Sequence, residues 1–231
     1  MRHKAVKATL DVGSSEEWND DHEVNFQEEI HHKDIFLDVA NINEWDATQN
    51  TSTTNPSITM VGGFACARLR GSGGAGNFGS IRHQLASAPA DITNHLAQPS
   101  VHMALNVETP TADNATHEFG LMANAGLPFA GNQDGAFFRI DNNVLFAVSS
   151  DGAGETTTNL GAPNQFGNYK ILHTATSDTF FVDDNETPVA THITNLSTAD
   201  LTIKLTCADR AGGDNYLNIQ ATCLCVLRQV A

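Results

Sequence analysis

Positive charge is scarce in this sequence, and no long stretch of it is hydrophobic. The 231 residues include 12 Lys and Arg against 27 Asp and Glu, for a formal net charge of −15. Nucleic-acid binding needs clustered cations that displace counterions from phosphates, and an anionic membrane repels an acidic chain. No run of 18 apolar residues occurs. We therefore expect neither nucleic acid as a partner nor insertion into a membrane.

Cysteine is also rare. Cys66, Cys207, Cys223 and Cys225 lack the pair spacing of a zinc site, and nothing in their spacing requires a disulfide. Cys223 and Cys225 would share one face of a strand, where thiols behave as small apolar side chains. We predict no metal and no cofactor. The first residues lack the apolar core of a signal peptide, so no export signal is expected.

The sequence does contain many short runs rich in aromatic and β-branched residues. Between residues 116 and 195 each run is closed by Asp, Asn or Gly, as strands and tight turns are. The turn residues pair 136–140 with 143–149 and 180–182 with 189–193 as hairpins. Residues 216–227 read as a long central strand. With ten to twelve strands and no amphipathic helix, the pattern predicts an all-β, antiparallel β-sandwich.

Residues 1–33 differ from the rest of the chain. They are rich in acids and histidines, with few apolar side chains, and cannot bury enough surface to fold alone. We predict an extended N-terminal attachment arm with Trp18, His22 and Phe26 as its contact residues, followed by the sandwich at 34–231. The neighbouring His31 and His32 lack metal-ligand spacing within one chain. They are either solvated or interface histidines, or a ring around the axis of a trimer.

Two resemblances add to this. Residues 2–5 and 11–22 of the arm resemble the opening segments of tailed-phage fibre and head-appendage proteins, which implies attachment to a virion. Residues 101–227 resemble the concanavalin-A-like jelly-roll domains of phage and other viral structural proteins. The motifs are Glu-Phe-Gly at 118–120, Asp-Gly-x-Phe-Phe-Arg at 134–139, Glu-Thr-Thr-Thr at 155–158, Tyr-Lys-Ile at 169–171 and Val-Ala-Thr-His at 189–192.

That superfamily includes glucanases and lectins, so the fold alone does not select a function. A retaining glucanase carries paired carboxylates, commonly as Glu-x-Asp-x-x-Glu on one strand, and this pattern is absent. Glu118 reads as a paired or solvent-facing residue. No Gly-x-Ser-x-Gly elbow is present either. We therefore predict that the chain is not an enzyme and has no catalytic residues.

Ligand binding has a small set of candidates. A lectin-like calcium or ligand site needs clustered carboxylate and amide oxygens, which occur only in two turns. Their alternative role as turn formers is favoured. No aromatic platform for a sugar can be identified, since most Phe read as core. The candidate ligand-binding residues are Asn132, Asp134, Asp183, Asp184 and Asn185.

From these observations we predict a virion structural protein located at the virion surface. It would be a capsid or tail appendage that docks on other virion proteins through its arm. We expect a homo-oligomer, with a trimer favoured, whose sandwich is displayed for adsorption to a host glycan. The alternatives are a stand-alone carbohydrate-binding, lectin-like module and, third, a glycoside hydrolase.

Overall fold

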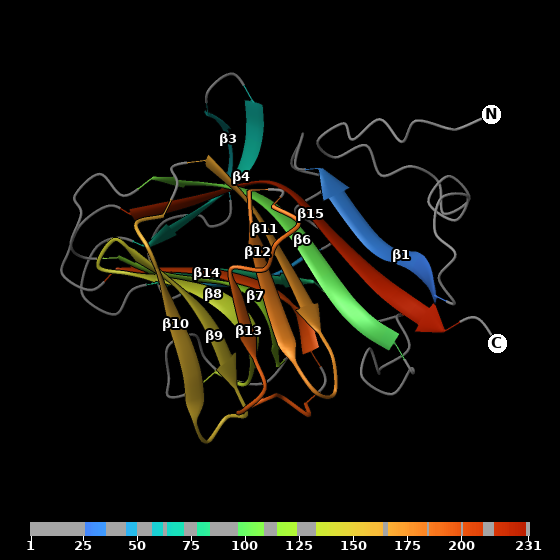
Figure 1. Cartoon of the computed structure of the whole chain (residues 1–231). Helices are drawn as coiled ribbons and strands as arrows, with labels where there is room; N and C mark the ends of the chain where they lie inside the picture. Colours follow the sequence, from blue (N-terminus) through green and yellow to red (C-terminus); the bar gives the residue numbers. More distant parts are fainter. Residues whose placement is uncertain are drawn as a thin grey trace.

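The computed structural model shows two antiparallel sheets packed face to face (Figure 1). It describes residues 26–35, 45–49, 57–61, 64–71, 78–83, 97–108, 115–123, 133–163, 166–183, 185–199, 201–209 and 215–229. These residues form fifteen strands and no helix. No helix among them is long and apolar enough to cross a membrane. The predicted all-β, antiparallel sandwich is confirmed.

The eight-stranded sheet has the order β13-β12-β11-β6-β15-β4-β3, with β1 also paired to β15. The long β15 is the central strand predicted from its sequence, because it pairs with β6 on one side and with β4 and β1 on the other. The strands are β13 (Ala190–His192), β12 (Asp178–Val182), β11 (Phe166–His173), β6 (Ala97–Glu108), β15 (Asn215–Gln229), β4 (Phe64–Gly71), β3 (Ser57–Val61) and β1 (Phe26–Ile35).

The seven-stranded sheet has the order β10-β9-β8-β7-β14-β5-β2. Its strands are β10 (Glu155–Gly161), β9 (Val144–Ser150), β8 (Gly135–Asp141), β7 (Ala115–Ala123), β14 (Leu201–Asp209), β5 (Phe78–His83) and β2 (Trp45–Gln49).

Both predicted hairpins are present. β8 and β9 are joined by Asn142 and Asn143, whose φ angles of 48° and 61° are those of a two-residue hairpin turn. β12 and β13 pair antiparallel, with Asp178 opposite His192. Asp183 begins the connection between them with a φ of 58°, a conformation that Asp and Asn tolerate better than most residues.

β1 lies along the second half of β15 (Figure 1), with Phe26 opposite Gln229. The boundary predicted after residue 33, between arm and sandwich, falls inside this strand. Phe26, which was expected to be an arm contact, is the first residue of β1. Trp18 and His22 lie outside the described residues.

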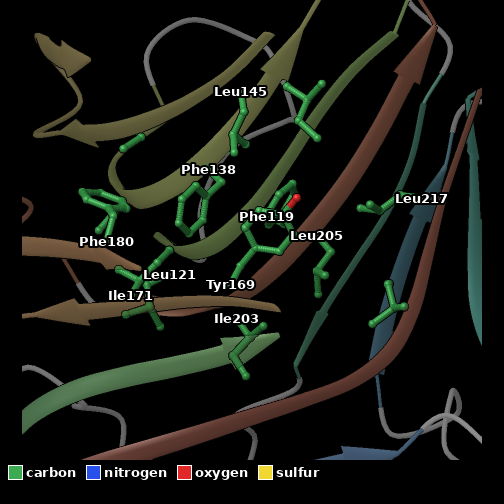
Figure 2. Packing of buried hydrophobic residues seen from close by; sticks show 14 of the residues in the cluster. Phe119, Leu121, Phe138, Leu145, Tyr169, Ile171, Phe180, Ile203, Leu205 and Leu217 are labelled. Carbon is green, nitrogen blue, oxygen red and sulfur yellow. The ribbon is translucent and has the colours of Figure 1, made fainter. Parts of the chain in front are cut away.

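An aromatic cluster joins the two sheets (Figure 2). Phe119 and Phe138 come from the seven-stranded sheet, while Tyr169 and Phe180 come from the eight-stranded sheet. The Tyr169 ring lies 4.9 Å from the Phe119 ring and 5.1 Å from the Phe138 ring, in edge-on geometry. Such pairs contribute beyond the area they bury, so this cluster fixes the distance between the sheets.

Neighbouring atoms of β8 and β11 leave no room for a side chain at Gly120. A Cβ atom there would lie 2.7 Å from Ala136 O and 2.7 Å from Ile171 Cδ1, and the φ of +152° is itself unfavourable for other residues. Glycine therefore allows β7 to approach β8 and the opposite sheet closely.

His117 is an isolated polar residue in the sandwich interior. Its side chain is fully buried, and neither ring nitrogen has a hydrogen-bond partner among the described residues. Burial lowers the pKa of this imidazole from 6.5 to about 4. Because the unfolded chain binds this proton at a higher pH than the folded chain does, folding loses stability as the pH falls from 6.5 towards 4.

We predict that His117→Leu removes this acid sensitivity. The wild type should lose about 3 kcal/mol of unfolding free energy over that range through His117 alone. The variant should lack this loss and be at least as stable at pH 7, because it buries no unpaired ring nitrogen. Urea unfolding at pH 7 and pH 4.5 measures both effects.

Ile140→Val, on the facing strand, is the control and should cost about 1 kcal/mol at either pH. An unchanged pH slope in His117→Leu would contradict the assignment.

Candidate functional site

Side-chain alternation along β8 gives the seven-stranded sheet two different faces. Phe138 and Ile140 belong to the main core cluster. Successive side chains of a strand point to opposite faces, so Phe137 and Arg139 lie on the outer face. There Phe137 packs with Met122, Val148 and the partly buried Phe146 in a second, smaller apolar cluster.

The strand register aligns outer-face residues in rows across β7, β8, β9 and β10. Glu118 lies opposite Arg139, and Arg139 lies opposite Phe146. Phe146 in turn lies opposite Asn159 of β10. One row thus carries a carboxylate, a guanidinium, an aromatic ring and an amide on four neighbouring strands.

Arg139 joins two carboxylates on this face. Its Nε donates to Glu118 Oε1 at 2.8 Å, while Nη1 and Nη2 donate to Glu155 Oε2 and Oε1 at 2.8 and 2.9 Å. The guanidinium carbon lies 5.3 Å from the centre of the Phe137 ring below it. Bidentate geometry of this kind is directional as well as strong, so the Arg139 side chain has a fixed orientation.

Glu118 is the buried member of this group, with a side chain only 2% exposed, against 20% for Arg139 and 19% for Glu155. Burial raises the pKa of the Glu118 carboxyl, and the Arg139 charge opposes this rise. The neighbouring Lys204 is also buried, which lowers its pKa, and its Nζ donates to Gln133 Oε1 at 3.0 Å.

The accessible part of the outer face lies over β8, β9 and β10, which are neighbours in the sheet (Figure 1). Over β7, β14 and β5 the same face is buried, as Met122, Thr206 and Ser80 show. Over β8 to β10, Phe137 and Val148 are buried, but several other side chains of this face are partly or fully exposed, and we call that exposed group the β8–β10 patch. Its members are Arg139, Phe146, Glu155, Thr157 and Asn159.

The edge strand β10 is shaped by a bulge next to this patch. The register with β9 shifts between Asn159 and Gly161, and Gly161 N donates to Asn159 Oδ1 at 2.8 Å. A bulge twists an edge strand and discourages sheet-to-sheet aggregation. Here it also fixes the Asn159 side chain.

The predicted ligand-binding residues are not brought together among the described residues. Asp134 precedes β8 in the seven-stranded sheet, beside Gly152 of the β9–β10 loop. Asp183 follows β12 in the other sheet, where its N donates to Asn168 O at 2.7 Å. Asn185 Oδ1 accepts from Thr187 N at 3.1 Å. Asn132 and Asp184 lie outside the described residues, which contain no group of three or more side chains able to hold a metal ion.

Sequence reasoning did not identify the β8–β10 patch. Most Phe were predicted to be core, but in β9 the side chains of Leu145 and Ala147 face the main core and that of Phe146 faces the other way. The patch could have been recognised from the register of the two consecutive hairpins β8–β9 and β9–β10. Counting outwards from the Asn142–Asn143 turn places Arg139 opposite Phe146.

Comparison with known proteins supports the fold assignment. No protein-family model matches this sequence, and no curated protein matches it. Among solved structures, a mixed-linkage glucan GH16 protein of Bacteroides ovatus has a TM-score of 0.59 at 10% identity, over 84% of this chain and 99% of that chain. The carbohydrate esterase vb_24B_21 of the Shiga toxin-encoding bacteriophage phi24B has a TM-score of 0.55 at 12% identity, over 86% and 99%.

A third similar structure is the binding domain of botulinum neurotoxin DC in complex with rat synaptotagmin II. Its TM-score is 0.51 at 11% identity, over 78% of this chain and 43% of that chain. The concanavalin-A-like jelly-roll fold expected from the sequence is confirmed. At such low identity the likeness shows the fold alone.

One prediction from the sequence is wrong. We predicted that the chain is not an enzyme, because the Glu-x-Asp-x-x-Glu pattern is absent. The structures that share its fold over most of its length include family 16 glycoside hydrolases and a carbohydrate esterase. Catalytic groups on such a sheet can come from different strands, so a missing single-strand pattern does not exclude an enzyme.

We predict that Arg139→Met destabilises the chain by about 3 kcal/mol, because Glu118 would keep a buried carboxylate without its cation. The loss should be larger at pH 8 than at pH 5, since protonation of Glu118 removes the unpaired charge. Chemical unfolding at the two pH values measures this. Lys170→Met is the control: Lys170 lies over the Phe181 ring at 5.4 Å, and its removal should cost under about 1 kcal/mol at both pH values. Equal losses in the two variants would contradict the role given to Glu118.

Proposed function

We propose that this chain binds a glycan through the β8–β10 patch. The main supporting observation is the strand register, which places the partly buried Phe146 on β9 between Arg139 on β8 and Asn159 on β10. Protein sites hold sugars by stacking on an aromatic ring, with charged or amide groups beside it for the hydroxyls. Thr157 and Glu155 on β10 add a hydroxyl and a carboxylate at the same place.

The patch is ordered before any ligand arrives. Arg139 is fixed by three hydrogen bonds to Glu118 and Glu155, and Asn159 by its bond from Gly161. Side chains that are already fixed lose little conformational entropy when a ligand binds. Such preorganisation favours a small polar ligand whose own contacts are individually weak.

In the wider setting, this glycan-binding sandwich is proposed to be part of a virion surface protein, attached through the residues that precede β1. Two observations support this: the resemblance of residues 2–5 and 11–22 to phage appendage proteins, and the likeness to a bacteriophage carbohydrate esterase. The target would then be a glycan of the host surface.

A second function has one specific observation in its favour. Glu118 combines burial and a raised pKa, which are the properties of a carboxyl that donates a proton to a glycosidic oxygen. Glu155, on the other side of Arg139, would be the second carboxylate. The hydrolase reading requires that Arg139 moves when substrate binds, since it now lies between the two acids.

We predict that Phe146→Ala lowers the affinity for a bound glycan about tenfold, because the stacking surface is lost. A glycan array identifies the ligand, and calorimetry measures the affinity. The control is Phe181→Ala, which removes a similarly half-buried ring from the outer face of the other sheet and should leave the affinity unchanged. Equal affinities in both variants would overturn the assignment of the patch. The same mixtures, assayed for new reducing ends, distinguish hydrolysis from binding.

The virion setting has its own test. Because β1 begins at Phe26, a chain that lacks residues 1–25 keeps every described strand. We predict that the full chain sediments with purified virus particles, that the shortened chain stays in solution, and that both bind glycan equally. If both chains sediment with the particles, the attachment site lies outside residues 1–25. If neither chain sediments, the virion proposal is contradicted.

A further inference from the structure

The edge strand β10 presents two different sets of side chains. Glu155, Thr157 and Asn159 face outwards in the patch, while Thr156 and Thr158 face the opposite sheet. Among the described residues, the backbone of β10 pairs only with β9. The placement of β10 therefore depends on what its inward side chains contact.

The inward side chains of β10 contact β13, which is the edge strand of the eight-stranded sheet, and the residues that directly follow β13. Thr158 Oγ1 lies 2.8 Å from His192 Nε2. Thr156 Oγ1 lies 2.7 Å from Thr194 Oγ1 and accepts from Asn195 Nδ2 at 3.1 Å. These side-chain bonds form a seam that joins the edge strands of the two sheets.

His192 is the titratable residue of this seam. Its side chain is buried, and its Nδ1 lies 2.9 Å from Ser149 Oγ of β9. It thus contacts two neighbouring strands of the opposite sheet, one through each ring nitrogen. The Phe180 ring lies 5.1 Å from the imidazole on its own sheet.

Among the described residues, the charged or titratable groups that face His192 come from its own sheet. Asp178 of β12 lies opposite His192 in the strand register. His173 of β11 lies on the far side of Asp178, and the His173 Nδ1 atom is 2.5 Å from Asp178 Oδ1. On β9 and β10 of the other sheet, the described groups that contact the His192 ring nitrogens are the hydroxyls of Ser149 and Thr158.

We propose that His192 is a positioning residue for the β8–β10 patch: by holding β9 and β10 from the opposite sheet, its neutral ring sets where Glu155, Thr157 and Asn159 lie. The expected effect of His192 on glycan affinity rests on the proposed glycan function. The structural part of the inference, the link between one buried imidazole and the outer face of β10, stands on the hydrogen bonds of the seam.

The charge state of the ring determines how firmly the seam is held. A neutral imidazole donates from one nitrogen and accepts at the other, which suits two hydroxyl partners. Burial lowers the pKa of His192, and the Asp178 charge opposes this shift. Because the folded chain binds this proton less readily than the unfolded chain, the seam is firmest at neutral pH and weakens as the pH falls through the lowered pKa.

The test is an NMR titration of the full chain from pH 7.5 to pH 4.5. We expect the amides of Glu155, Thr157 and Asn159 to shift with the same midpoint as the His192 ring. Thr158→Val keeps the shape of the side chain but loses the bond to Nε2. It should remove this shared titration and lower glycan affinity at pH 7.5 about fivefold. Thr179→Val, a half-buried threonine on the outer face of β12, is the matched control and should do neither.

Glu118 also titrates and reaches the patch through Arg139, so His192→Gln separates the two sources. This variant should abolish the shared midpoint on β10 and leave any Glu118-dependent shift on β8. A His192 ring that titrates without the β10 amides would overturn the proposal, as would identical behaviour of Thr158→Val and Thr179→Val. If the wild type binds no glycan at any pH, the proposed function fails, while the amide titration still decides whether His192 positions β10.

Discussion

The alternation of side chains along each strand is the constraint on which this structure depends. In the seven-stranded sheet it sends Phe119 and Phe138 towards Tyr169 and Phe180 of the opposite sheet. The residue next to Phe138, Arg139, must then lie on the outer face. The core thus determines which positions are available for recognition, and a shift of one residue in register would exchange the two sets.

The two edge strands show how a sandwich can support a site at its margin. β10 and β13 belong to different sheets and share no backbone pairing. Side chains such as Thr158 and His192 connect them instead. A bulge after Asn159 interrupts the regular register of β10 with β9. An exposed edge strand is ordinarily a risk for aggregation. In this protein, the outward-facing side chains of the edge strand β10 form part of the β8–β10 patch.

The sequence predicted the fold class well, because the turn residues Asn142, Asn143 and Asp183 identify the hairpins locally. The members of the β8–β10 patch follow from the register of two consecutive hairpins, but the contacts that hold the patch join residues far apart in sequence. Glu118 and Arg139 are 21 positions apart and His192 and Ser149 are 43 apart, and no local pattern marks either pair. The prediction that the chain is not an enzyme rested on a missing single-strand motif, and the fold that the chain shares with family 16 glycoside hydrolases and a carbohydrate esterase contradicts it.

Glycan binding by the outer face over β8 to β10 is the central claim, and it is tested most directly by mapping amide chemical shifts on addition of a glycan selected from an array. The account predicts that the shifts concentrate at Arg139, Phe146 and residues 155–159, with little change around Phe181 on the outer face of the other sheet. Shifts concentrated on the eight-stranded sheet, with none on β8 to β10, would contradict it.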